Sequence, residues 1–537
     1  MNPSNGALLE LGWALGNGAE KLSVQSVVLR QPEGKPIPRR IQAITGISEK
    51  EAILGEDLET AWAKLSHSVP QSAVWVIHYS KFEWAFIASL FSHASPKVIC
   101  TYEVARRLLP GLGSHTIRAV CGHLGQPLSS LKRAGDHVEA TAFVWAKMLK
   151  LLAEQEGVHT FEEFEDWFEK TPPLKNGAKK RTRTYLVESD TRLQLSESPG
   201  TYHLKDCNGR VLYVGKATSL KSRVNSYFRG KQTKGSRLNE MLAQVADIKV
   251  HPAATPLEAA LLENDQIKEI DPPYNRALKA EARQVFYCDS DFSVVEDQEL
   301  SRFGPFSTSA WWTHWVTMLE AREKPEVLAA LLSSESDATA EPEMVVDGVK
   351  ILEADGRVPF SRNPESIRYW LSRGYTERIA LLKQRRHEAE TTPVDEEEEE
   401  PVAEAVPEWD AERVARRLRR SCGHIAFRVH AGRWVRRFSD SVLTYREPKE
   451  KEFRELRFRD GILVSAKNKK AFAPARVAVP KKLTSVSLVT LDRLRVLRTE
   501  ILRVLTGKGE VILQSAGQAP LASAKLKQYL FPGQFDG

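Results

Sequence analysis

Two short strand-like runs joined by a tight turn constrain the fold of this chain most strongly. Residues 201–206 and 210–214 are rich in strand-forming residues, and Asn208-Gly209 between them is the dipeptide most typical of a two-residue hairpin turn. Each run carries a tyrosine near a glycine, in Pro199-Gly200-Thr201-Tyr202 and in Tyr213-Val214-Gly215-Lys216. The sequence therefore predicts a β-hairpin that presents two phenols.

Further polar residues follow this hairpin at informative spacings. Arg223 and Tyr227 are four residues apart in a basic segment, which places them on one face of a predicted helix. A second predicted helix carries Glu263, and a loop with Pro272-Pro273-Tyr274-Asn275 comes after it. Phenols, a cation, one carboxylate and an amide are a set suited to metal-assisted cleavage of a phosphodiester.

The segment from 197 to 280 resembles a GIY-YIG nuclease domain of the UvrC excinuclease type. The matched stretches are 213–220, 223–228 and 261–268. Thr201 and Val214 stand where the family name has isoleucine, and both are β-branched residues that suit a strand. The resemblance implies a GIY-YIG α/β fold, a small antiparallel sheet flanked by helices.

The same resemblance implies roles for individual residues. Glu263 would bind one divalent ion, Mg²⁺ or Mn²⁺, with water and a phosphate oxygen completing its coordination. Tyr213 would be the general base, and because a phenol has a pKa near 10, Lys216 or the metal would have to favour its phenolate. Arg223 would stabilise charge in the transition state, and Tyr202 and Tyr227 would position water and phosphate. Asn275 would hold the loop after the helix in place.

Residues 1–155 resemble a DnaQ-like (DEDD-type) exonuclease of RNase H-like fold, on the matches 8–12, 44–47 and Thr101 with 106–110. Such enzymes hold two metals with four carboxylates. Only seven residues precede the first match, so we expect the strand with the first two carboxylates to be missing. At the third carboxylate position the chain has Glu83 instead of aspartate. The fourth carboxylate should follow a histidine by five residues. One alignment puts Lys132 at the histidine and His137 at the carboxylate, and the other puts Leu131 and Asp136 there. We predict a catalytically inactive docking domain; a longer natural N-terminus with a working 3′→5′ exonuclease is the alternative.

Length and composition bound the remaining possibilities. A chain of 537 residues is too long for one hydrophobic core. It contains no apolar run of 18 residues, no signal-peptide pattern at its start and no Cys-x-x-Cys among its five cysteines. These features predict a multidomain α/β protein of a reducing cytoplasm, associated with the nucleoid, without a membrane span, a zinc site or a disulfide framework.

The predicted organisation has six parts. After the exonuclease-like domain come a linker (156–196), the nuclease domain (197–280), a UvrC-like following segment and helical region (281–387), an acidic disordered linker (388–409) and a basic α+β domain (410–537). For the last we predict a helix over 411–420, strands over 425–429 and 434–438 separated by a turn at Ala431-Gly432, three further strands, a helix over 490–506 and a strand over 510–514. A tryptophan stripe near 311–315 favours helix packing over base stacking.

Charge is concentrated near the C-terminus. Residues 411–482 contain 21 Lys and Arg against 7 Asp and Glu, whereas the whole chain has a net charge of only +7. Such an excess is typical of a phosphate-binding surface, although many charged stretches are simply solvated. The candidate nucleic-acid contacts are Lys216, Lys221, Arg223, Arg413, Arg416, Arg417 and Arg420.

Together these patterns favour a DNA endonuclease that makes single-strand incisions in DNA repair of the nucleotide excision type, with DNA and other repair proteins as partners. No segment resembles the second nuclease or the UvrB-binding part of UvrC, so a complete excinuclease subunit is not expected. Two alternatives remain: a bifunctional exonuclease/endonuclease, and a non-catalytic DNA-binding scaffold.

Overall fold

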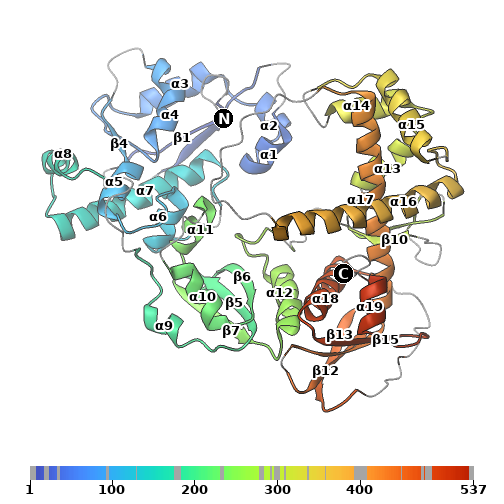
Figure 1. The fold of residues 1–537 in the computed structure, drawn as a ribbon. Coiled ribbons are helices and arrows are strands. Elements are labelled where there is room, and N and C mark those ends of the chain that lie inside the picture. The colour runs from blue at the N-terminus through green and yellow to red at the C-terminus, as the bar shows by residue number, and fades with distance from the viewer. Residues whose placement is uncertain are drawn as a thin grey trace. The chain divides into compact units, whose positions relative to one another are not determined.

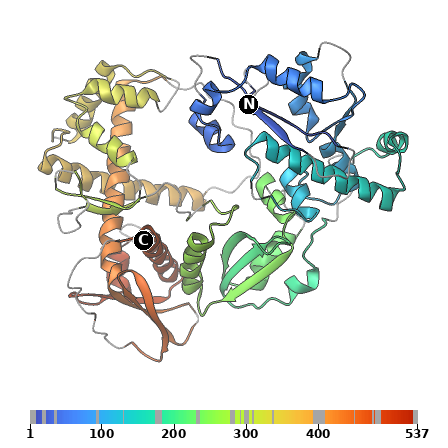
Figure 2. The same cartoon turned by 180° about the vertical axis from the view of Figure 1, so that it is seen from behind.

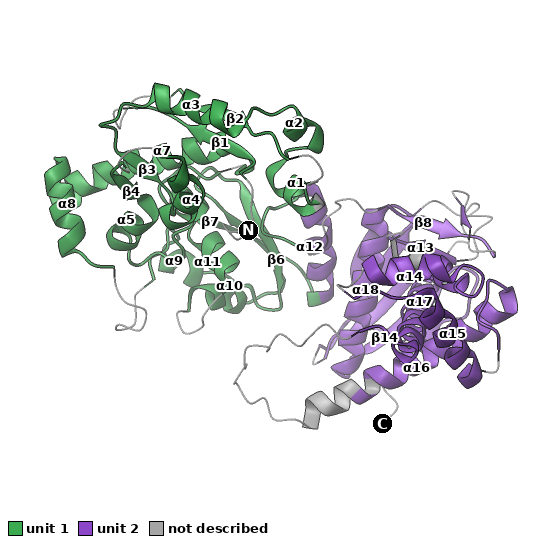
Figure 3. Ribbon diagram, turned by 90° about the horizontal axis from the view of Figure 1, so that it is seen from above, with its two compact units in different colours: residues 1–256, 270–276 green, residues 257–269, 277–537 purple. Residues whose placement is uncertain are grey.

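The computed structural model divides the chain into two compact units (Figure 3). The first comprises residues 1–256 and 270–276, and the second comprises residues 257–269 and 277–537. The structure describes residues 8–16, 23–32, 37–91, 96–128, 130–173, 183–229, 235–276, 278, 284–290, 293–295, 303–307, 310–334, 338–356, 358–391, 408–448, 450–472, 477 and 486–530.

The exonuclease-like part of the first unit has short strands and many helices (Figure 1). Strands β1 and β2 pair antiparallel, whereas β3 and β4 pair parallel. A buried core lies among α5, α6, α7 and α8, where Val104, Val120, Val144 and Trp167 are all shielded from solvent. The elements are β1 (Glu10–Trp13), β2 (Gln25–Val28), α1 (Arg39–Thr45), α2 (Glu49–Ile53), α3 (Leu58–Ser68), β3 (Trp75–Ile77), α4 (Ser80–Ile87), η1 (Ala88–Leu90), β4 (Val98–Cys100), α5 (Thr101–Leu108), α6 (Ile117–His123), α7 (Ala134–Leu151), η2 (Leu152–Glu156) and α8 (Phe161–Lys170).

The predicted hairpin is present in the second part of the first unit. Strands β5 (Gly200–Lys205) and β6 (Val211–Ala217) pair antiparallel, and β7 (Asp247–Pro252) joins on the other side of β5. Gly209 has φ 79°, the left-handed conformation that the Asn-Gly turn requires. Helices α9 (Ser189–Leu193), α10 (Leu220–Phe228) and α11 (Ser236–Leu242) complete this part, and α12 (Pro256–Ile270) follows β7.

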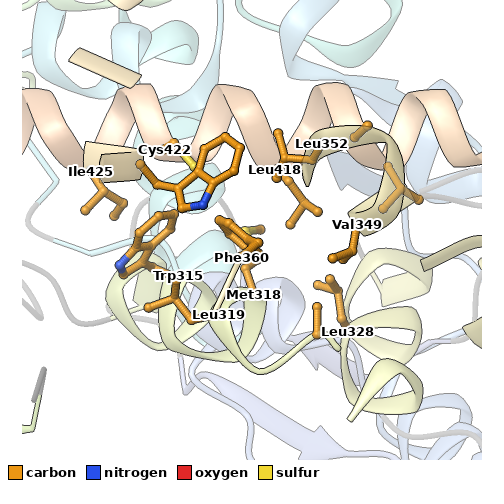
Figure 4. Close-up of a cluster of buried hydrophobic side chains, with 14 of the residues drawn as sticks. Trp315, Met318, Leu319, Leu328, Val349, Leu352, Phe360, Leu418, Cys422 and Ile425 are labelled. Carbon is orange, nitrogen blue, oxygen red and sulfur yellow. The ribbon is translucent and has the colours of Figure 1, made fainter. Parts of the chain in front are cut away.

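The second unit contains a helical layer built on the long helix α17 (Ala411–Ser439). Its core gathers Trp315, Phe360, Leu418 and Ile425, and Figure 4 shows these side chains converging between the helices. Trp315 is 1% exposed, so it packs in the core. The other elements are β8 (Phe286–Cys288), β9 (Val294–Val295), β10 (Phe303–Phe306), α13 (Ala310–Leu319), α14 (Pro325–Ser334), α15 (Pro342–Gly356) and α16 (Pro364–Thr391).

A five-stranded antiparallel sheet of order β13-β12-β11-β14-β15 ends the second unit (Figure 2). Helix α18 lies in its apolar core, with Leu491, Leu497 and Ile501 fully buried. The bounds are β11 (Ser441–Arg446), β12 (Phe453–Arg459), β13 (Ile462–Lys469), α18 (Leu488–Thr506), β14 (Glu510–Ser515), β15 (Leu521–Ala522) and α19 (Ser523–Leu530).

The prediction of two strands over 425–429 and 434–438 is wrong, because both runs belong to the single helix α17. The buried residues Val414, Leu418, Cys422, Ile425 and Val429 recur every three or four positions, which is helical spacing. Gly432 makes no turn; it allows close approach of β10, since a Cβ there would lie 2.8 Å from the Gly304 carbonyl oxygen. Residues 286–288 and 294–295 form the short antiparallel pair β8–β9.

Two other predictions concern the linker and the membrane. Most of the acidic linker predicted at 388–409 lies outside the described residues. Among the helices that the structure does describe, none combines the length and the apolar character needed to cross a bilayer.

Candidate active site

Three of the predicted site residues form a hydrogen-bonded chain in the first unit. Tyr202 on β5 is completely buried, and its hydroxyl lies 2.8 Å from the hydroxyl of Tyr227 on α10. The Arg223 Nη2 donates to the same Tyr227 hydroxyl at 3.2 Å. Because residues 223 and 227 are one helical turn apart, α10 presents both groups to β5 together. An exposed guanidinium is thus linked to a buried phenol through one hydroxyl.

Tyr213 on β6 completes a cluster of three phenols. Its ring centroid lies 6.2 Å from that of Tyr202 and 6.5 Å from that of Tyr227. Burial, together with the neighbouring Tyr227 and Tyr213 phenols, raises the pKa of Tyr202 well above its usual range. Tyr202 therefore keeps its proton at neutral pH, whereas Tyr213 is only half-buried and accessible to water.

The charge of Arg223 acts on the whole cluster. Burial lowers the pKa of this guanidinium, but the Tyr202, Tyr227 and Tyr213 phenols outweigh that effect, and the net pKa is raised. A cation that interacts with three phenols favours negative charge on whichever of them loses its proton.

Gly215, which our prediction of site residues omitted, gives Tyr202 its place. The two residues are direct cross-strand partners in the β5–β6 pair. A Cβ at position 215 would lie 2.4 Å from the Tyr202 hydroxyl oxygen and 2.5 Å from Cζ, closer than atoms can approach. The glycine of the Tyr-Val-Gly triplet is therefore needed as empty space beside the phenol, a signal that the motif itself carries.

We expect Gly215→Ala to displace the Tyr202 ring and break its hydrogen bond to Tyr227. Overpacking at a buried position costs about 1–3 kcal/mol, and chemical denaturation measures this loss. Gly235→Ala is the matched control, because nothing lies within 4 Å of a Cβ at that position. Equal stability of the two variants would contradict this explanation.

Asn275 holds the edge of β6. Its Nδ2 donates to the Val214 carbonyl oxygen at 2.8 Å, and its Oδ1 accepts from the Val214 amide at 2.9 Å. Tyr274 donates its own amide to the Leu212 carbonyl oxygen at 3.0 Å. The loop after α12 thus pairs with β6 as a further strand would, and this keeps the strand that carries Tyr213 in place.

The two predicted lysines differ in exposure. Side chains alternate along a strand, so exposed Lys216 projects from the face of β6 opposite to Tyr213. Lys221 lies half-buried in the first turn of α10.

Glu263 lies on α12, half-buried, in the segment that belongs to the second unit. The structure therefore brings together the three tyrosines, Arg223 and Asn275 within the first unit, and it describes Glu263 with the second. Within the described residues, the contacts of α12 with the C-terminal domain include those of Leu257, Glu258, Leu261, Asp265 and Lys268. At about 100° per residue, these form one stripe, and Glu263 projects from the opposite side of the helix.

Three ion pairs fix α12 to the C-terminal domain. Arg454 donates two hydrogen bonds to Glu258, at 2.8 and 2.9 Å. Arg493 lies 2.9 Å from Asp265. The Lys268 Nζ lies 2.8 Å from the Asp492 carboxylate, with the two side chains only 3% and 4% exposed. These contacts fix both the rotation and the height of the helix.

The four predicted arginines near the start of α17 differ in exposure. Arg416 and Arg420 are exposed, and Arg416 forms a surface pair with Glu412. Arg413 lies over the Trp409 ring, 4.4 Å from its centroid, and Arg417 donates to the Ser421 hydroxyl at 3.0 Å.

The exonuclease-like part places its polar residues in structural contacts. His78 lies between the Thr101 hydroxyl and the His115 carbonyl, and burial lowers the pKa of this imidazole to about 4. Asp136 accepts hydrogen bonds from the Lys132 and Arg133 amides at the start of α7. Burial raises the pKa of Glu83. In the part of the chain that the structure describes, no three His, Cys, Asp or Glu side chains are grouped as metal ligands would be.

The fold and the cluster define a class of domain: residues 198–276 match the UvrC-like GIY-YIG domain. This stretch is thus a nuclease-type domain within a longer chain.

Particular relatives share this part. The UvrABC system protein C of Chlorobium phaeobacteroides is 44% identical over 90 residues, 17% of this chain and 14% of that protein. A Mycobacterium tuberculosis protein provisionally named bifunctional exonuclease/endonuclease is 29% identical over 251 residues, 45% of this chain and 37% of that protein. The crystal structure of the magnesium-bound GIY-YIG N-terminal endonuclease domain of UvrC from Thermotoga maritima is 28% identical, covering 16% of this chain and 93% of that one, with a TM-score of 0.15. This chain therefore spans well under two thirds of the first two relatives.

Proposed function

We propose that this protein is a metal-dependent DNA endonuclease that makes single-strand incisions during DNA repair. The observation that carries the proposal is the Tyr202–Tyr227–Arg223 hydrogen-bond chain beside Tyr213, on a domain that matches the UvrC-like GIY-YIG family. Phenols and a guanidinium in contact are suited to binding water and a phosphate oxygen. They can then stabilise the negative charge that develops on the phosphate during cleavage.

The donor set fits one Mg²⁺ or Mn²⁺ ion. Mg²⁺ is commonly held by one or two carboxylates, with water and substrate phosphate supplying its other ligands. Glu263 is a half-buried carboxylate on a helix that three ion pairs hold in place, which makes it the candidate ligand. When bound, the ion would neutralise charge on the scissile phosphate.

The roles of the other residues follow from their surroundings. Tyr202 keeps its proton, so it acts as a hydrogen-bond donor and not as a base. Tyr213, in its phenolate form, is the residue that accepts a proton from the attacking water. It is accessible, and the neighbouring Arg223 cation favours the phenolate. Arg223 also stabilises charge on the phosphate in the transition state. Asn275 acts through β6 by keeping Tyr213 in position.

The test is incubation of purified protein with end-labelled DNA duplexes. Nicked, flapped, bulged and lesion-bearing substrates are compared with Mg²⁺, with Mn²⁺ and with EDTA. We expect a metal-dependent single-strand cut in at least one of them. DNA binding without cleavage under any divalent ion would favour the scaffold alternative.

For residues 1–155 we propose an RNase H-like domain that docks DNA or other repair proteins without cutting. Glu10, on the first described strand, accepts hydrogen bonds from the Arg133 side chain and from the Ala134 amide. Asp136 is used to cap α7. Carboxylates engaged in this way are poor candidates for a two-metal site. A 3′→5′ exonuclease assay on single-stranded DNA separates this proposal from the bifunctional alternative.

A further inference from the structure

The second unit contains a pocket lined with cations. It has a volume of about 350 Å³ and lies between α16, α17 and α18. Phe427 adds an aromatic surface to its polar lining, which comprises Arg378, His424, Arg428, Arg495, Arg498 and Thr499. Among the described residues that line it, none is acidic.

The arginines of this pocket are held in partly buried positions. Arg498 lies over the Phe427 ring, 5.3 Å from its centroid, and donates to the Leu530 carbonyl oxygen at 3.1 Å. Arg495 donates to the Ser307 hydroxyl at 2.8 Å; it also lies 3.7 Å from Asp492, whose carboxylate is shared with Lys268. Burial lowers the pKa of Arg428 and of Arg498. An anion in the pocket would offset the cost of withdrawing these cations from water.

The pocket also continues a row of basic residues on α17. Positions 413, 417, 420, 424 and 428 follow one another at steps of three or four, so they share one face of the helix. Burial lowers the pKa of His424, and the positive charges of Arg378, Arg428, Arg417 and Arg420 lower it further. The four arginines are therefore close enough to His424 to interact with it electrostatically. From 413 to 428 the row extends about 22 Å along the helix axis. A linear polyanion fits such a row better than an isolated small anion does.

We propose that the row, which ends in the arginine pocket, binds the phosphates of a nucleic-acid strand, with one nucleotide phosphate seated in the pocket. Guanidinium groups are suited to phosphate because they donate in a planar fork. Phe427 offers a surface against which the sugar or base can lie. This surface rests on the proposed function and extends it, since it would hold the strand for the nuclease domain. The sequence patterns indicated the start of the row but not the arginines of the pocket.

The test is binding of a fluorescein-labelled single-stranded oligonucleotide to the full chain in EDTA, measured by anisotropy. We expect Arg378→Gln combined with Arg428→Gln to weaken binding about tenfold or more. The slope of log affinity against log salt should also become shallower by about one to two. Arg433→Gln is the matched control, because that exposed arginine lies on the opposite face of α17 and its loss should leave affinity unchanged.

Thermal unfolding with inorganic phosphate or with a free deoxynucleotide distinguishes the source of the phosphate and checks the fold of the variant. If either ligand stabilises the natural protein but not the folded double variant, the pocket is a phosphate site. If the double variant then still binds the oligonucleotide with natural affinity, the occupant of the pocket is a free nucleotide and not a strand. Equal responses of both proteins to all three ligands overturn the proposal. Since no cleavage is measured, failure of the nuclease proposal would appear separately, as absence of nicking by the natural protein.

Discussion

Replacing Glu263 with glutamine should reduce metal-dependent nicking at least about a hundredfold, because charge stabilisation by a bound divalent ion contributes several kcal/mol to phosphodiester cleavage. The substitution keeps the size of the side chain and removes only its charge. The rate is measured under single-turnover conditions over a range of Mn²⁺ concentrations, which shows whether added metal restores activity.

Glu269→Gln is the matched control for this experiment. Glu269 lies on the same helix α12, is exposed, and loses the same charge. We expect this variant to nick at the natural rate and both variants to unfold as the natural protein does. Nicking by the Glu263→Gln protein at the natural rate would remove this residue from the proposed site.

The second large effect is expected at the ion pair between Lys268 and Asp492. Asp492→Ala leaves the Lys268 ammonium buried without its carboxylate, and breaking a buried pair in this way costs about 3–5 kcal/mol. Guanidinium denaturation followed by tryptophan fluorescence measures the loss, since Trp434 belongs to the same apolar core as Leu257 and Leu261 of α12.

Two comparisons make this prediction specific. Asp347→Ala removes one member of an exposed pair whose side chains are 69% and 59% exposed, and it should cost less than about 1 kcal/mol. The double change Lys268→Met with Asp492→Leu should recover most of the stability, because an apolar pair can replace a buried ionic one. A small effect of Asp492→Ala would show that the pair does not anchor α12.

The parts of the fold that sequence predicted correctly are those with local determinants. The hairpin follows from Asn208-Gly209 between two strand-like runs, and α10 follows from the spacing of its residues. The α17 error has the opposite origin. Five-residue windows such as 425–429 suit a strand as well as a helix, and only burial of the whole length against α13–α16 decides between them.

The candidate site shows the same division. The matched motif indicated the tyrosines, Arg223 and Asn275, which lie close together in the first unit. It could not indicate the partners of α12, because Arg454 and Asp492 are separated from it by about two hundred residues. Nor did it indicate the arginine pocket, which depends on three helices meeting in space.

Helix α12 falls within the 198–276 match, yet its partners lie beyond position 430. Leu257 and Leu261 pack in the apolar core of the C-terminal domain. The charges of Glu258, Asp265 and Lys268 are paired with side chains of the same domain. The matched segment is consequently not expected to form an independently folding domain in this protein. A shortened chain that stops at residue 276 would expose the apolar residues of α12 and leave Lys268 without its carboxylate partner. Residue 276 is therefore an unsuitable boundary for expressing the nuclease domain alone.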